Sequence, residues 1–142
     1  LADHWALVRR RRMKPLIEGG RMSIANMLDE IKRHPDFEKV GMILIHNGVV
    51  RATTRDGRRV NGLKVAVDHA KLEQILKEQS QKPGIVDIRV HIVENKNLAV
   101  GDDIMHLIVA GDIRENVISV LTQTLDAIKK KVTKKTEYFM EL

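Results

Sequence analysis

An uncharged apolar run at residues 40–45 precedes a glycine and an arginine, Gly48 and Arg51. Both faces of a two-residue repeat would be apolar in this run, which predicts a central strand that is buried on both sides. Gly48 allows a turn or a close approach to a ligand, and the guanidinium group of Arg51 suits a phosphate or a carboxylate. We therefore expect a rigid strand that presents Arg51, although an ordinary turn and a solvated arginine also fit these residues.

Helical spacing of apolar residues, together with capping residues, predicts three helices. In the last of them, Glu115 follows Asp112 by three residues, which is the spacing of a capping box. The predicted helices run from Ser23 to His34-Pro35, from Asp68 to about Gln79, and from Asp112 into a lysine cluster that follows Ile128.

Further strands are predicted at residues 60–67, 86–92 and 104–110, with an exposed arginine-containing loop at 51–59. In residues 86–92 the polar Asp87, Arg89 and His91 alternate with apolar residues, which predicts one wet face. The order is helix, strand, strand, helix, strand, strand, helix. Its short connections favour an α+β domain with a mainly antiparallel sheet and helices packed on it.

Length and composition fit one domain at residues 22–142, preceded by a basic arm at residues 1–21. We expect the arm to be disordered or partly a cloning remnant, because Met22 is a plausible start. The chain has no cysteine, which excludes disulfides, a thiolate nucleophile and a zinc-thiolate site. No apolar run approaches the roughly 20 residues that span a bilayer, so we expect a cytoplasmic protein without membrane contact.

The net charge of +6 is uneven along the chain, because the first 22 residues hold six of the 25 basic residues and only two of the 19 acidic ones. A second basic cluster lies near the C-terminus, at Lys129, Lys130, Lys131, Lys134 and Lys135. The four aromatic residues are not interleaved with these charges as a base-stacking platform would require, so nucleic acid is an unlikely partner. A small anionic ligand or an acidic protein explains the lysines equally well.

Candidate catalytic groups lie on the last helix, where Arg114 and Lys129 would share one side at opposite ends. Lys129 would border the buried face, where partial desolvation could lower its pKa toward acid/base use, although a lysine that complements the helix dipole fits equally. His46 precedes Arg51 by five residues and is the most interesting of six histidines. No metal-ligand spacing and no nucleotide or serine-hydrolase motif is present, so we expect neither metal nor cofactor.

From about Met22 to Lys135 the sequence resembles the large, catalytic subunit of molybdopterin synthase. The segments that carry the resemblance are His34-Pro35, Gly48-Val49-Val50-Arg51, Val100-Gly101-Asp102, Ala110 to Arg114, and Asp126-Ala127-Ile128-Lys129. The resemblance implies an α+β homodimer in which each copy receives the Gly-Gly tail of a small ubiquitin-like sulfur carrier. The tail's thiocarboxylate gives sulfur to cyclic pyranopterin monophosphate, a pterin phosphate, and two transfers build the dithiolene of molybdopterin.

The resemblance also implies roles for individual residues. Arg51 and Arg114 would hold the substrate's phosphate or the carrier's carboxylate, and Lys129 would be the general acid/base. His46, which stands where the family usually has Phe, and Gly48 would lie beside the bound anion. Lys135 would be a second catalytic lysine after a shift of one residue, since an ungapped match places Thr136 there.

Two other functions fit the sequence. A non-catalytic homologue would keep the dimer scaffold and bind an anionic ligand or a protein partner. A nucleic-acid-binding domain would use the arginines of the arm, at residues 9–12.

Overall fold

The computed structural model describes residues 23–140, so the predicted basic arm lies outside the described residues. The helices are α2 (Ile24–Lys32), α3 (His69–Ser80) and α4 (Arg114–Ala127), with a 3-10 turn η1 (Phe37–Lys39) and a π-helical turn η2 (Ile128–Val132). The strands are β1 (Met42–Val49), β2 (Val60–Val67), β3 (Ile85–Ile92), β4 (Leu98–Ala99), β5 (Asp103–Gly111) and β6 (Thr133–Phe139). This composition confirms the predicted α+β class.

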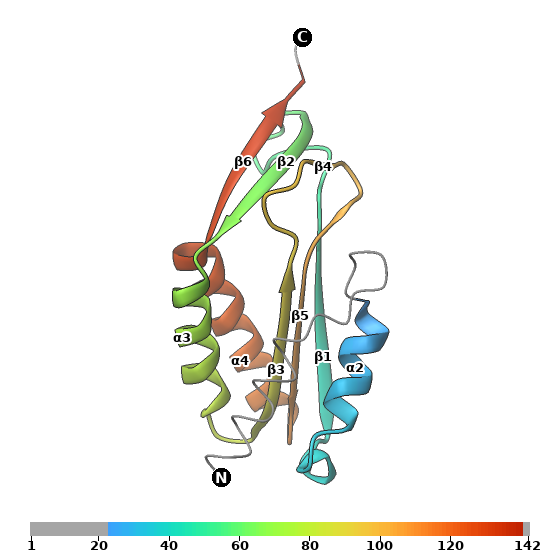
Figure 1. Cartoon of the computed structure of the whole chain (residues 1–142), viewed down its shortest axis with the longest axis vertical. Coiled ribbons are helices and arrows are strands. Elements are labelled where there is room, and N and C mark those ends of the chain that lie inside the picture. Colours follow the sequence, from blue (N-terminus) through green and yellow to red (C-terminus); the bar gives the residue numbers. More distant parts are fainter. Residues whose placement is uncertain (1–22, 141–142) are drawn as a thin grey trace.

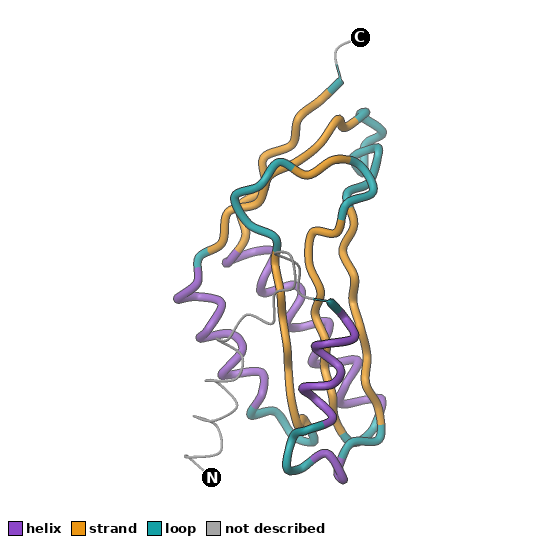
Figure 2. Tube along the Cα trace, turned by 45° about the vertical axis from the view of Figure 1, so that its right-hand side comes forward, coloured by secondary structure: helices purple, strands orange, loops and turns teal. Residues whose placement is uncertain are grey.

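The strands form two antiparallel three-stranded sheets rather than one, with the orders β1-β5-β3 and β4-β2-β6. Figure 1 shows the first sheet between α2 on one side and α3 with α4 on the other, and the second sheet at the far end of the molecule. The tube in Figure 2 shows the loops that connect the two sheets. The larger core lies beneath α3 and α4 and reaches the second sheet, whereas a smaller core lies beneath α2.

The predicted central strand is an edge strand, because β1 pairs only with β5, and β5 is the middle strand of its sheet. Met42 and Leu44 pack into the larger core, while Ile43 packs into the smaller one beneath α2. Beyond that point α2 no longer covers the strand, and Ile45 is 39% exposed. The expectation of burial on both faces therefore holds only for the first half of the run.

Gly48 does not form a turn. It lies within β1 opposite Met105, and a shift in strand register follows it at Val49. The chain leaves the strand at Val50, which is 2% exposed and is held by hydrogen bonds with the backbone of Asp102 and Gly101. The turn comes later in the predicted loop, at Gly57, whose φ of 87° favours glycine.

Two of the three predicted helix caps are confirmed. The side chains of Ser23 and Asp68 accept hydrogen bonds from backbone N–H groups in the first turns of α2 and α3. The capping box at Asp112 is wrong, because Ile113 is the N-cap residue of α4 and makes no side-chain cap. Asp112 lies one residue earlier, where its carboxylate accepts hydrogen bonds from the Ile113 N–H and from Asn116.

The sequence patterns missed β4 and β6, and they extended the last helix too far. The helix ends in η2, after which the chain returns as β6 and pairs with β2. Within the described residues β6 is an outer strand whose residues are exposed or only partly buried, so it has no apolar alternation to reveal it. Lys134 and Lys135 therefore belong to a strand and not to a helix.

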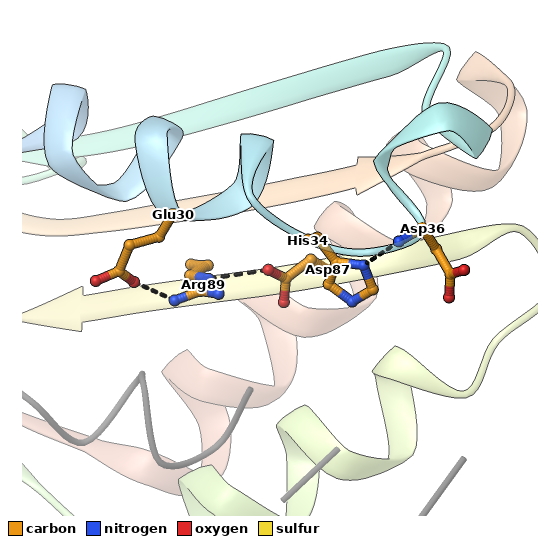
Figure 3. Close-up of polar contacts among 5 residues, drawn as sticks. All are labelled: Glu30, His34, Asp36, Asp87 and Arg89. Atoms are coloured by element: carbon orange, nitrogen blue, oxygen red, sulfur yellow. Dashed lines mark hydrogen bonds and ion pairs between the residues drawn. The ribbon is translucent and has the colours of Figure 1, made fainter. Parts of the chain in front are cut away.

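The predicted wet face of β3 is buried under α2. Arg89 lies between two carboxylates, because its Nε donates to Asp87 at 2.9 Å and its terminal nitrogen pairs with Glu30 of α2. The side chains of Arg89 and Asp87 are 5% and 1% exposed. Figure 3 shows this row of charges beside His34, whose Nδ1 accepts a hydrogen bond from the Asp36 N–H. The pairing of opposite charges allows these side chains to be buried, although their alternation with apolar residues predicted a solvent-exposed face.

Among residues 23–140, none of the helices combines the length and apolar character needed to pass through a bilayer.

Candidate functional site

The structure brings two of the predicted site residues together, His46 on β1 and Lys129 on η2. Met42 and Leu44 face the larger core, and the two-residue repeat of a strand places His46 on the same face. Lys129 approaches this face from the π-helical turn that follows α4, and its charge acts on the His46 imidazole. The half-buried His46 thus feels the positive charge of the exposed Lys129.

The local sequence explains why η2 presents Lys129. The two ends of the turn are anchored by apolar side chains, because Ile128 is fully buried and Val132 is 4% exposed. The three lysines between them are exposed and must point away from the core. The partial desolvation expected for Lys129 is therefore not found.

Burial and the nearby positive charge of Lys129 both lower the pKa of His46, and burial is the larger cause. His46 is therefore neutral near pH 7, where it can accept a hydrogen bond or a proton. A second histidine, His91 on β3, behaves similarly: burial lowers its pKa first, and its strand partner His106 lowers it further.

These pKa shifts predict an acid-sensitive fold. Above the ordinary histidine pKa of 6.5 both the folded and the unfolded chain are neutral at His46 and His91. When the pH falls below 6.5, these histidines bind protons in the unfolded chain but remain largely neutral in the folded chain, where their pKa is lower. The free energy of unfolding therefore falls as the pH falls. We expect a lower urea midpoint at about pH 5.5 than at about pH 7.5. The double variant His46→Gln/His91→Gln should show a smaller drop between these pH values, and an unchanged drop would contradict the assignment.

Gly48 provides space on the same face of β1 as His46. A Cβ atom at Gly48 would lie 3.2 Å from the Met105 side chain and 3.5 Å from Nε2 of His46. The first distance is tighter than ordinary van der Waals contact, so a larger residue would displace one of these side chains. The absence of a side chain at Gly48 thus leaves room for the side chains of His46 and Met105.

Arg51 lies beyond the end of β1 and is exposed. Its Nε donates a 2.7 Å hydrogen bond to the carbonyl oxygen of Thr53, which uses one of its five donors. The anchored Val50 fixes the backbone from which it projects. No other hydrogen bond or ion pair of this side chain is found among residues 23–140, which leaves four N–H donors for an anion at this end of the strand.

The other two predicted residues are not brought to this site within the chain. Arg114 is the first residue of α4, and fifteen residues at 1.5 Å per residue put it roughly 22 Å from Lys129 along the axis. Its side chain is 77% exposed and lies near Glu115. Lys135 lies on β6 opposite Val65, and its ammonium group pairs with Glu137 at 2.9 Å.

Sequence reasoning missed two groups of polar residues. One is the row Glu30, Arg89 and Asp87 under α2, and the other is the strand pair His91 and His106, of which His106 is 7% exposed. The alternation in β3 correctly predicted that Asp87, Arg89 and His91 share one face. The error was to expect that this face is exposed to solvent. Among the described residues, no three His, Cys, Asp or Glu side chains are grouped so that they could hold a metal ion.

Comparison with known proteins gives consistent matches. The sequence model of the MoaE protein family matches residues 19–131. No curated protein sequence matches the chain significantly. Among solved structures, molybdopterin synthase from Staphylococcus aureus has a TM-score of 0.63 at 22% identity, covering 78% of this chain and 85% of that one.

Two further structures resemble this fold. Molybdopterin cofactor biosynthesis protein E from Burkholderia multivorans has a TM-score of 0.65 at 16% identity, covering 84% of each chain. A complex of subunits 1 and 2 of molybdopterin-converting factor from Helicobacter pylori contains a chain with a TM-score of 0.62 at 13% identity, covering 84% of this chain and 85% of that one. At these identities the matches establish a shared fold.

Proposed function

The chain belongs to the MoaE protein family, and we propose that it is the large subunit of a molybdopterin synthase that acts in molybdenum cofactor biosynthesis. The observation that carries the proposal is the match of the family's sequence model to residues 19–131, and the structure adds that the charge of the exposed Lys129 acts on the half-buried imidazole of His46. A neutral histidine, a lysine and the exposed guanidinium of Arg51 could supply the proton transfer and anion binding that sulfur transfer requires.

The proposed reaction transfers sulfur from a thiocarboxylate at the Gly-Gly tail of a small carrier subunit to cyclic pyranopterin monophosphate. The sulfur is already a nucleophile, so the large subunit mainly orients the reactants and manages protons. Its attack forms a carbon–sulfur bond while a carbon–oxygen bond of the substrate breaks, and the oxygen that leaves takes a proton from Lys129. Water then hydrolyses the thioester that still joins the sulfur to the carrier, so the carrier leaves with an ordinary carboxylate and the sulfur stays on the pterin. Arg51, which keeps four free donors, holds a phosphate or a carboxylate.

The proposed assembly contains two copies of this chain and a small subunit for each. The Helicobacter pylori complex of two different subunits, which shares the fold, supports a heteromeric assembly. A second copy also accounts for Arg114, which is too far from Lys129 along α4 to share one small substrate with it. We place the enzyme, a sulfur transferase, in the cytoplasm, where a chain without cysteine has no need of oxidising conditions.

The proposal predicts single-turnover formation of the dithiolene when the protein is mixed with a thiocarboxylated small subunit and cyclic pyranopterin monophosphate. A carrier with an ordinary carboxylate at its tail should give no product, because it has no sulfur to transfer. A molybdopterin synthase of known activity serves as the positive control. If that control works and this protein yields no product, the chain is a non-catalytic homologue.

A further inference from the structure

A groove of about 450 Å³ lies where β2 ends and β6 begins, next to the first residues of α3 (Figure 1). Its walls are residues 66–68 on one side and residues 130–134 on the other. We propose that this groove binds a phosphate-rich ligand, such as one that carries a pyrophosphate group. The proposal is separate from sulfur transfer, because Lys129 does not line the groove.

Three lysines give the groove its charge. Lys130, Lys131 and Lys134 all line it, and all three are exposed. None of them makes an ion pair or a hydrogen bond with another residue among 23–140. Lys135, the next residue on β6, differs because it pairs with Glu137 at 2.9 Å and lies outside the groove. Three lysines therefore line one groove without an ion-pair partner among residues 23–140.

The one carboxylate in the lining does not neutralise these lysines. Asp68 caps α3, and its Oδ1 accepts a 3.1 Å hydrogen bond from the Lys71 N–H. Its other oxygen lies 3.9 Å from the ammonium group of Lys71, which is not part of the lining. Asp68 still carries one negative charge, but it faces three positive ones, so the lining keeps a formal net charge of +2.

The backbone around the groove is held by regular pairing. Ala66 pairs with Lys134 and Val67 with Thr133 across the two strands, and the Asp68 N–H donates a 2.9 Å hydrogen bond to the Val132 carbonyl. The small side chain of Ala66, opposite Lys134, leaves room above the strands. Buried Ile128 and Val132 fix the turn that carries the other two lysines.

The three lysines suit an anion that carries several charges. A lysine ammonium group is a compact charge with three donors and commonly binds phosphate oxygens, and pyrophosphate offers several such oxygens at once. The groove presents these ammonium groups without any arginine. It also contains no aromatic residue on which a base could stack, which disfavours single-stranded nucleic acid.

Calorimetric titration of the full chain with sodium pyrophosphate tests the proposal. We expect saturable binding that weakens when the salt concentration rises from about 20 mM to about 200 mM. The triple variant Lys130→Ala/Lys131→Ala/Lys134→Ala should lose about tenfold or more in affinity. The matched control Lys32→Ala/Lys77→Ala/Lys82→Ala removes the same charge from exposed positions elsewhere and should bind within about twofold of the unaltered chain.

Three results would overturn the proposal. Pyrophosphate fails to bind at low salt, or both triple variants lose affinity equally, which would show only an effect of net charge. Alternatively, a tetra-aspartate peptide binds more tightly than pyrophosphate, which would assign the groove to a carboxylate-rich partner. Because titration needs no turnover, failure here leaves the proposed sulfur transfer untouched, and the reverse also holds.

Discussion

Lys129→Ala is expected to lower the single-turnover rate of dithiolene formation by about 10²- to 10⁴-fold, the usual contribution of a general acid or base. The side chain is exposed, so its removal should change the free energy of unfolding by no more than about 0.5 kcal/mol. The rate is measured with saturating thiocarboxylated carrier, and stability by urea denaturation of the same samples. A rate like that of the unaltered protein would remove Lys129 from the mechanism.

Two further variants separate proton transfer from charge. Lys129→Arg keeps the positive charge but cannot give up a proton near neutral pH, so it should bind substrate and remain slow. Lys77→Ala removes an exposed lysine of α3 that lies outside the site and should leave the rate unchanged. If Lys129→Arg restores the rate, Lys129 acts by electrostatic attraction alone.

Arg89→Ala is expected to reduce the free energy of unfolding by about 3–5 kcal/mol, because it removes the cation that Asp87 and Glu30 share under α2. Domains of this size are commonly stable by only about 5–15 kcal/mol, so the variant should be close to unfolding at 37 °C. Urea denaturation measures the loss directly. The control Arg33→Ala removes an exposed arginine at the end of α2 and should cost less than about 0.5 kcal/mol.

A triple variant tests the cause of this loss. Glu30→Gln/Asp87→Asn/Arg89→Met removes all three charges while keeping side chains of similar size, so no charge of the row stays buried without its partner. It should recover most of the stability that Arg89→Ala loses. If the triple variant is as unstable as Arg89→Ala, packing of the arginine side chain is the main contribution.

Local signals predicted the parts of the fold that local residues determine. Residues 60–67 form the predicted strand, and Asp68 caps the predicted helix. The strand at β1 was found, but its place at the edge of the sheet depends on partners far away in the sequence. The face of β3 was assigned wrongly because Glu30, more than fifty residues earlier, supplies the charge that allows Arg89 to be buried.

The sequence named the residues of the candidate site, but it did not predict how the fold arranges them. The sequence named His46 and Lys129, but the influence of the lysine charge on the imidazole depends on how the fold places the two segments, which no local pattern encodes. Arg114 and Lys129 were expected on one side of a continuous helix. The π-helical turn that begins at Ile128 interrupts that helix. The regular α-helical rotation per residue, from which a shared side was predicted, therefore does not apply as far as Lys129.

The pairing of β2 with β6 has a consequence for the order in which the chain folds during its synthesis. The sheet β1-β5-β3 can close once residue 111 has been made, whereas β2 must wait for residues 133–139. Closing such a long loop is entropically costly, and chains emerge from the ribosome N-terminus first. Until then Leu63 and Val65, which the finished fold buries, lack β6 beside them. The nascent chain is therefore exposed to mispairing and aggregation at β2 until residues 133–139 have been made.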